Sequence, residues 1–279
     1  MSHDAPTHLD LFSGIGGFAL AAQWAGFRTV GFCEIEPYCQ ALIKERFGAC
    51  SDSEQSGLEG IAGKGLPSSR RPSVKSPRIH SDIFTLSGTS YLGVDLITGG
   101  FPCQPFSVAG KRRGAADDRA IWPQMLRVIA EARPSWVLAE NVPGIINMEL
   151  DRVLSDLGAV GYSVGTLVIP ACAADAKHRR YRVWIMGHAD QGGIRRAGTP
   201  WEQGHTAFAS QTQPDTGCEL LERWSGEPAQ GPTQWIPEPA VGRVAHGVPR
   251  RVDRLKGLGN AIVPQVAYQI LREIRKLIG

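Results

Sequence analysis

Residues 10–19 read DLFSGIGGFA, the end of an apolar strand followed by a glycine turn and the start of a helix. Glycines let the backbone approach a ligand closely, and the helix N-terminus presents unpaired N–H groups. Glu34 stands twenty positions after Gly14, at the end of the next expected strand, where an acid can bind ribose hydroxyls. Taken alone, this pattern fits a structural turn, a NAD-type site or a site for a different adenosyl ligand.

Short apolar runs alternate with helical patterns outward from this turn. The apolar runs lie at 8–12, 29–34, 94–100 and 136–140, and the helical patterns lie at 16–26, 37–48 and 121–132. Gly26 and Gly48 follow two of the helical patterns in the C-capping position. The alternation predicts an α/β fold with βαβ units and a mostly parallel sheet.

Two stretches interrupt this alternation and divide the chain. Residues 49–80 are rich in Ser, Gly, Pro and Arg, which predicts a flexible, solvated insertion rather than a dedicated DNA-binding arm. The Gly-, Pro-, Gln- and Thr-rich stretch 188–242 predicts a small second region. We therefore expect a main unit at 1–187, the small region at 188–242, and a segment 243–279 that returns to the main unit and ends in a helix from about Pro264 to Ile278.

The overall composition predicts a folded soluble protein of the cytoplasm. The 279 residues are 42% hydrophobic and 20% charged, and the net charge of +3 is too small for a histone-like polycation. No apolar run reaches the roughly 18–20 residues of a membrane span, and the N-terminus lacks a signal-peptide pattern. The six cysteines are expected to be free thiols, and without a CxxC pair we expect no metal site.

Cys103 stands in the segment GGFPCQPFS, directly after the apolar run VDLIT. This order places a thiol at the carboxyl edge of a parallel strand, where open α/β sheets bind ligands. The loop continues with Lys111, Arg112 and Arg113, and nearby cations favour the thiolate form. We expect Cys103 to be a nucleophile, with inert packing of the thiol as the alternative.

Two further segments carry groups suited to chemistry. Glu140 ends the run WVLAE, where a buried carboxyl can act as a general acid, whereas Asn141 can simply cap a helix. Arg180 and Arg182 alternate in an extended segment, so both project from one face toward an anionic or carbonyl-bearing substrate. A solvated basic edge strand is the alternative for these two arginines.

The C-terminal residues 243–262 combine clustered basic charge with the glycine turn GLGNAI. Basic charge beside a glycine turn suits phosphate contacts. A charged surface helix would have a similar sequence.

Together, and in this order, the motifs DLFSGIGGF, GGFPCQPFSVAGKRRG, ENV, HRRYR and GNAIVP resemble those of bacterial and phage cytosine-5 DNA methyltransferases. The resemblance spans about residues 9–187 and 243–270. It implies the Rossmann-like fold of S-adenosylmethionine-dependent methyltransferases, a mostly parallel sheet with helices on both faces, plus a small irregular target-recognition region at 188–242.

The resemblance also implies roles for individual residues. The glycine turn would bind S-adenosylmethionine, with Glu34 on the ribose hydroxyls and Asp82 on the adenine amino group. Cys103 would attack cytosine and Glu140 would meet its N3 atom. The implied cofactor-binding residues are Phe12, Gly14, Ile15, Gly16, Gly17, Glu34, Ile35, Asp82, Ile83, Pro102 and Asn260. The implied catalytic residues are Cys103, Glu140, Arg180 and Arg182, and the implied substrate-binding residues are Gln104, Ser107, Lys111, Arg112, Arg113 and Asn141.

The implied partner is double-stranded DNA, bound by a monomer without a metal. An RNA methyltransferase of the same fold, a catalytically silent DNA-binding relative and a NAD-dependent oxidoreductase are the other readings. Two departures from the family pattern stand out. The stretch before HRRYR lacks the usual Gly and Pro, and the region 188–242 holds seven acidic residues against three arginines, a net charge of 3 − 7 = −4.

Overall fold

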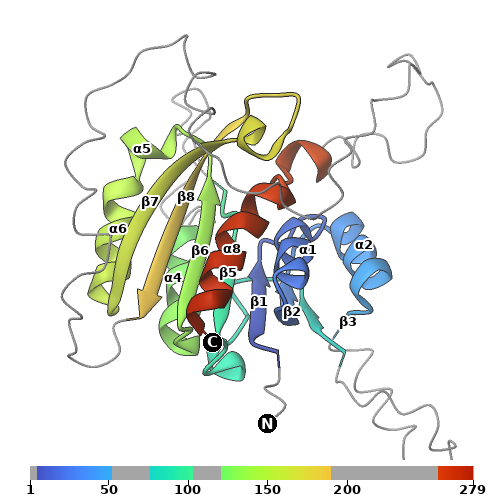
Figure 1. Ribbon diagram of the computed structural model, residues 1–279. Coiled ribbons are helices and arrows are strands. Elements are labelled where there is room, and N and C mark those ends of the chain that lie inside the picture. The colour runs from blue at the N-terminus through green and yellow to red at the C-terminus, as the bar shows by residue number, and fades with distance from the viewer. Residues whose placement is uncertain (1–4, 52–75, 103–120, 190–256, 279) are drawn as a thin grey trace, which may run out of the picture.

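The computed structural model describes residues 5–51, 76–102, 121–189 and 257–278. They form an eight-stranded sheet in the order β3-β4-β2-β1-β5-β6-β8-β7 (Figure 1). The strands are β1 (Thr7–Leu11), β2 (Arg28–Cys33), β3 (Cys50–Ser51), β4 (Arg78–His80), β5 (Leu96–Gly99), β6 (Trp136–Asn141), β7 (Tyr162–Pro170) and β8 (Tyr181–Ala189). The helices are α1 (Gly17–Trp24), α2 (Pro37–Phe47), α4 (Ile121–Ala132), α5 (Ile145–Met148), α6 (Leu150–Ala159) and α8 (Pro264–Ile278), with 3₁₀ turns η2 (Gly88–Tyr91) and η3 (Ala171–Ala174).

The predicted mostly parallel sheet is confirmed. Strands β3, β4, β2, β1, β5 and β6 run parallel to one another, and β8 runs antiparallel between β6 and β7. Because β8 is reversed, the strand begins at the sheet edge where its parallel neighbours end. Residues at the start of β8 therefore lie beside the carboxyl ends of β5 and β6.

Helices cover both faces of the sheet, as predicted. Successive residues of a strand point to opposite faces, so Val137 packs with α4 and α6 while Leu138 packs with α1 and α8. The same alternation occurs in β5, where Leu96 joins the α1 and α8 layer and Ile97 joins the α4 and α6 layer. The short apolar runs of the sequence are thus buried on both sides, as parallel strands require.

The helix ends and the predicted boundaries can be compared directly. Gly26 and Gly48 follow α1 and α2 with φ of 85° and 62°, the left-handed conformation of a helix C-cap, and α8 spans the predicted residues. The predicted bounds of the insertion, 49–80, are too wide. Strands β3 and β4 at its two ends pair in the sheet, and Ile79 packs into the core. Residues 52–75 lie outside the described residues. Strand β8 also crosses the expected boundary after residue 187, and 190–242 lie outside the described residues.

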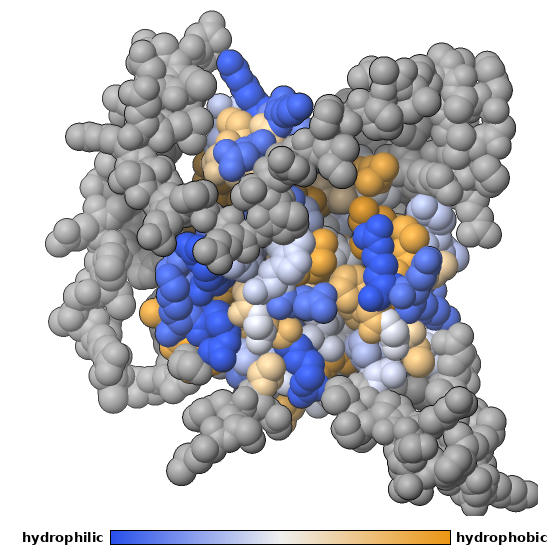
Figure 2. All heavy atoms as spheres, turned by 45° about the vertical axis from the view of Figure 1, so that its right-hand side comes forward, coloured by the Kyte–Doolittle hydropathy of each residue, from blue (hydrophilic) through white to orange (hydrophobic). Residues whose placement is uncertain are grey.

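The surface and the helices bear on whether a described helix could span a membrane. On the face in Figure 2, hydrophilic and hydrophobic side chains of the described residues are interspersed. None of the helices in the described ranges combines the length and apolar character needed to cross a membrane.

A chain of buried polar groups crosses the centre of the sheet. His8 contacts Thr29 Oγ1 at 2.9 Å through Nδ1 and Thr98 Oγ1 at 2.8 Å through Nε2, and Thr98 donates to Asp10 Oδ1 at 2.9 Å. If the imidazole carries its proton on Nε2, every donor points the same way, from Thr29 toward Asp10. Burial raises the pKa of Asp10 to about 8 and lowers that of His8 to about 3. Both groups are therefore mostly neutral at pH 7.

Asp10→Asn is expected to change how stability depends on pH. The pKa of Asp10 is raised on folding, so its contribution to stability is complete below about pH 4 and is lost as pH rises toward 8. The contribution of His8 has the opposite sign and changes only below its unfolded pKa of 6.5. Between pH 6.5 and 8, urea denaturation should therefore show the wild type losing stability relative to Asp10→Asn, with a slope of up to about 1.4 kcal/mol per pH unit. Parallel curves for the two proteins would contradict this expectation.

Candidate active site

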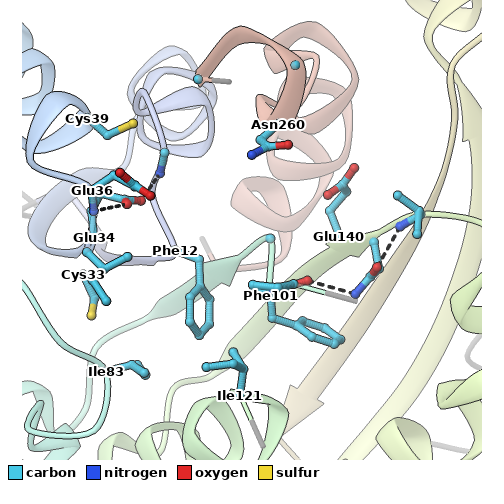
Figure 3. A pocket seen from close by; sticks show the side chains of 18 of the residues that line it. Phe12, Cys33, Glu34, Glu36, Cys39, Ile83, Phe101, Ile121, Glu140 and Asn260 are labelled. Atoms are coloured by element: carbon cyan, nitrogen blue, oxygen red, sulfur yellow. Dashed lines mark hydrogen bonds between the residues drawn. The ribbon is translucent and has the colours of Figure 1, made fainter. Parts of the chain in front are cut away.

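A cavity of about 540 Å³ opens at the carboxyl ends of the parallel strands (Figure 3). Its walls come from the segments that follow β1, β2, β4, β5 and β6, from the start of β8, and from residues 257–260 before α8. The carboxyl edge is where open α/β sheets bind their ligands. A second hollow of about 30 Å³ adjoins it and is lined by Ile15 and Gly17. Gly14 and Asn260 line both spaces.

The glycine turn after β1 is packed too tightly for side chains. Gly16 has φ of 85°, and a Cβ atom there would lie 2.5 Å from the Phe47 ring of α2. A Cβ atom on Gly17 would lie 2.8 Å from Ile262 Cγ1, just before α8. Both glycines thus let α1 approach its neighbours, and Gly16 lines neither cavity in the described structure.

Glu34 fixes the geometry of the glycine turn. Its Oε2 atom accepts a hydrogen bond from the Gly14 N–H at 2.6 Å, and its Oε1 atom accepts one from the Glu36 N–H at 2.8 Å. The carboxyl is 7% exposed, and burial raises its pKa. Each carboxylate oxygen can accept more than one hydrogen bond, so Glu34 can also receive hydroxyl donors from the cavity.

The residues after β4 form an apolar wall with one carboxylate. Asp82 lines the cavity, and its Oδ1 atom accepts the Phe84 N–H at 2.9 Å. Ile35 and Phe84 also line the cavity and are 72% and 46% exposed. Large apolar side chains at this exposure offer surface for a flat ring, while the Asp82 carboxylate offers acceptors for an amino group. Ile83 is buried and also lines the cavity.

Glu140 is a buried acid whose pKa lies near neutral pH. It is the penultimate residue of β6, is 7% exposed, and forms an ion pair of 2.8 Å between its Oε1 atom and Arg182 Nε on neighbouring β8. Burial raises the pKa of Glu140 to about 7, although Arg182 and Arg180 lower it. Both the acid and the carboxylate are therefore populated at pH 7, which is the condition for general acid–base chemistry.

Arg180 lines the cavity and donates to the backbone through one of its guanidinium nitrogens, while its buried Nε atom has no hydrogen-bond partner among the described residues. Its Nη2 atom donates to the carbonyl oxygens of Gly259 at 2.8 Å and Ala261 at 2.9 Å. It thereby holds the turn that presents Asn260 to the cavity. The predicted alignment of Arg180 and Arg182 on one face of an extended strand agrees with the structure, whereas their contact with a nucleotide stays a prediction.

Asn141 also lines the cavity, with its amide used inside the protein. Its Nδ2 atom donates to the Phe101 carbonyl at 3.0 Å, and its Oδ1 atom accepts the Val142 N–H at 2.8 Å (Figure 3). These bonds tie the end of β6 to the loop after β5, which carries Pro102 into the cavity wall. Asn141 thus ends a strand and does not cap a helix.

The predicted site residues divide into three groups. The structure brings Phe12, Gly14, Glu34, Ile35, Asp82, Ile83, Pro102, Glu140, Asn141, Arg180, Arg182 and Asn260 together around the larger cavity. Ile15 and Gly17 border the smaller hollow, and Gly16 packs against α2. The predicted residues Cys103, Gln104, Ser107, Lys111, Arg112 and Arg113 lie outside the described residues.

Some lining residues are absent from the sequence-based set. Glu36, Tyr38 and Cys39 follow Glu34, and Phe84 follows Asp82. Their closeness in the sequence to Glu34 and Asp82 was the signal that could have identified them. Among the described residues, no group of three or more His, Cys, Asp and Glu side chains is arranged to hold a metal ion.

The sequence that forms this fold matches the model of a known protein family. Residues 7–68 and 72–227 match the model described as C-5 cytosine-specific DNA methylase. The chain therefore belongs to the C-5 cytosine-specific DNA methylase family, as the motifs predicted.

Curated relatives agree with this assignment, and solved structures share the fold. The chain is 33% identical to the type II methyltransferase M.NgoMIV of Neisseria gonorrhoeae over 52% of this chain and 38% of that protein. It is 36% identical to the type II methyltransferase M.PspPI of Psychrobacter sp. over 64% of this chain and 38% of that protein. It thus aligns with less than half the length of each.

The crystal structure of S. pombe Dnmt2 methyltransferase shares the fold, with a TM-score of 0.51 and 21% identity over 68% of this chain and 52% of that one. That of a Spodoptera frugiperda DNMT2 mutant gives a TM-score of 0.52 and 18% identity over 70% of this chain and 54% of that one.

Proposed function

We propose that this chain is a DNA cytosine-5 methyltransferase that uses S-adenosylmethionine. The observation that carries the proposal is the position of Glu140, a half-protonated buried acid in the same cavity as the Glu34 and Asp82 carboxylates. Cytosine chemistry needs a proton donor, and an adenosyl cofactor needs hydrogen-bond acceptors beside an apolar wall. The cavity offers both within one space.

The described residues fit the adenosyl cofactor. Glu34 offers free lone pairs for ribose hydroxyls, and Asp82 offers a carboxylate oxygen beside the apolar side chains of Ile35 and Phe84. When bound, S-adenosylmethionine supplies an electrophilic methyl group. The backbone of the glycine turn meets the cavity at Gly14, while Gly16 and Gly17 let α1 pack against Phe47 and Ile262.

The protein residues then divide the chemistry of the base between them. The Cys103 thiolate adds to C6 of cytosine while Glu140 gives a proton to N3, which makes C5 an enamine carbon able to take the methyl group. The C5 proton then passes to solvent, the thiolate leaves C6 and N3 returns its proton to Glu140, which restores the aromatic ring. Arg182 holds the Glu140 carboxyl in place through its 2.8 Å ion pair. The reacting base has to leave the helix to reach this cavity.

The proposal includes the partner and the recognition region. Double-stranded DNA is the proposed substrate, bound by a monomer in the cytoplasm of a bacterial or phage-infected cell. Residues within 188–242 are proposed to read the target sequence, with the loop residues Lys111, Arg112 and Arg113 contacting phosphates.

Transfer of a tritiated methyl group separates this proposal from its alternatives. The full chain should label double-stranded DNA, and bisulfite sequencing of plasmid from an expressing cell should show protected cytosines at a short site. Labelling of tRNA alone would overturn the DNA assignment, and labelling of neither polymer would overturn the enzymatic one.

Glu34→Ala is expected to weaken cofactor binding by roughly 1.5–3 kcal/mol, because hydrogen bonds to a charged group are lost. Isothermal calorimetry with S-adenosylhomocysteine measures the change. Glu45→Ala removes the same charge from the exposed side of α2 and should leave the affinity unchanged. Unchanged affinity in Glu34→Ala, or tight binding of NAD by the wild type, would contradict the assignment.

A further inference from the structure

Residues 81–87 connect β4 to η2, and the first four of them, 81–84, form one wall of the cavity. Their own hydrogen bonds satisfy amide groups, since the Leu86 N–H donates to the Asp82 carbonyl at 3.1 Å and the Phe84 N–H donates to Asp82 Oδ1 at 2.9 Å. These bonds leave the carbonyl oxygens of Ile83 and Leu86 to be satisfied from elsewhere.

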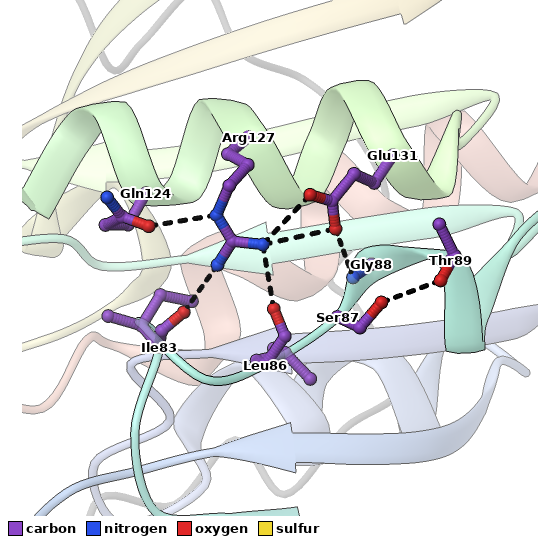
Figure 4. A network of polar contacts seen from close by, with 8 residues as sticks. All are labelled: Ile83, Leu86, Ser87, Gly88, Thr89, Gln124, Arg127 and Glu131. Atoms are coloured by element: carbon purple, nitrogen blue, oxygen red, sulfur yellow. Dashed lines mark hydrogen bonds and ion pairs between the residues drawn. The ribbon is translucent and has the colours of Figure 1, made fainter.

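Arg127 of α4 satisfies both carbonyl oxygens. Its Nη2 atom donates to the Ile83 oxygen at 2.8 Å, and its Nη1 atom donates to the Leu86 oxygen at 2.9 Å (Figure 4). Hydrogen bonds from a charged guanidinium are stronger than those between neutral groups, and its rigid fork fixes two acceptors at once. Arg127 does not itself line the cavity.

The guanidinium is held in turn by its own helix. Its Nε atom donates to Gln124 Oε1 at 2.9 Å, and its Nη1 atom lies 3.0 Å from Glu131 Oε1. Glu131 also reaches the end of the same connection, because its Oε2 atom accepts the Gly88 N–H at 2.7 Å. A Cβ atom on Gly88 would lie 2.5 Å from the Val128 carbonyl, so this end is pressed against α4.

We propose that Arg127 is a positioning residue for the cofactor cavity. It anchors the backbone on either side of Phe84, and so sets where Asp82 and Phe84 meet the ligand. The inference rests on the proposed function, since it takes the ligand to be an adenosyl cofactor. Arg127 thereby acts on cofactor binding from outside the cavity. It does so through Asp82 and Phe84, which its own side chain does not contact.

A second arginine of the chain makes a matched control. Arg152 on α6 forms an ion pair with Asp156 four residues later, at 3.6 Å between Nε and Oδ2, as Arg127 does with Glu131. Within the described part of the chain, Arg152 donates to no backbone carbonyl. Arg152→Met therefore removes a helix ion pair alone, whereas Arg127→Met also releases the connection.

The full chain is tested by calorimetry with S-adenosylhomocysteine and by methyl transfer to DNA. Arg127→Met should raise the Kd about 10-fold or more and the KM for S-adenosylmethionine in parallel, while kcat at saturating cofactor changes less than about 3-fold. Arg152→Met should change neither quantity by more than about 2-fold. Arg127→Lys, which keeps the charge but not the fork, should give an intermediate Kd. If Arg127→Met does not fold, an unchanged Kd in Arg127→Lys would overturn the inference.

A double-mutant cycle tests whether Arg127 acts through Asp82. In the Asp82→Ala background, Arg127→Met should raise the Kd for S-adenosylhomocysteine by clearly less than its effect in the wild type, because part of that effect acts through Asp82. Independent, multiplying effects would overturn the inference, as would an unchanged Kd in Arg127→Met. Failure of the wild type to bind S-adenosylhomocysteine would instead overturn the proposed function, so the two failures are distinguishable.

Discussion

Cys103→Ala is expected to abolish methyl transfer, with a fall in single-turnover rate on the order of 10⁴–10⁶-fold, as when a covalent nucleophile is removed from other enzymes. Without addition to C6, C5 of cytosine stays a poor nucleophile and cannot take the methyl group. Cys103 itself lies outside the described residues, but it follows Pro102, which lines the cavity. Transfer of a tritiated methyl group from saturating cofactor to saturating DNA measures the rate.

A covalent trap makes the same prediction visible without turnover. DNA that contains 5-fluorocytosine has no C5 proton to lose, so the wild type should form a denaturation-resistant complex with it. Cys172→Ala is the matched control, because Cys172 is a free thiol in η3 that does not line the cavity. It should trap DNA as the wild type does. A trapped complex with Cys103→Ala would show that another group is the nucleophile.

Glu140→Gln is expected to lower the methylation rate by about 10²–10⁴-fold, the usual contribution of a positioned general acid. The amide keeps the size of the side chain but has no proton to give to N3 of cytosine. The pKa of Glu140 is raised to about 7, so its acid form is complete at low pH and disappears as pH rises through that value. Single-turnover rates of the wild type should therefore fall above about pH 7, and this limb should be absent from the residual rate of Glu140→Gln.

Arg182→Met provides an independent check on this assignment. Arg182 lowers the pKa of Glu140, so its removal should move the falling limb to higher pH while lowering the rate itself. Arg152→Met, which changes a charge outside the cavity, should leave the profile unmoved. A limb that stays in place in Arg182→Met would mean that a group other than Glu140 titrates.

Much of the fold follows from local sequence patterns. Apolar runs of five to seven residues between helical patterns predicted β1, β2, β5 and β6 in a parallel sheet, and the glycines after α1 and α2 predicted the helix ends. The strands β3 and β4 were missed because they are two and three residues long, too short for a periodic signal, and are defined by pairing with β2 and with each other. Tertiary context decides such segments.

Many of the residues that line the candidate site could be predicted from the sequence, but the contacts between them could not. The motifs gathered Glu34, Asp82 and Glu140 at one edge because parallel strands end there. Spacing could not show that Arg180 bonds to backbone carbonyls 79 and 81 residues away, or that Asn141 uses its amide on Phe101. Such long-range partners depend on how the segments pack, and nothing in a single chain segment records them.

Helix α8 determines when, during synthesis, the chain can first bind its cofactor. Residues 257–260 complete the cavity wall, and Ala267 and Leu271 of α8 pack with Ala21 and Ala22 beside the glycine turn (Figure 1). Synthesis delivers the N-terminal strands long before these residues. Until α8 has emerged, a ribosome-bound chain therefore lacks the α8 residues that pack against α1 and also lacks part of the cavity wall. Cofactor binding is expected only after that point.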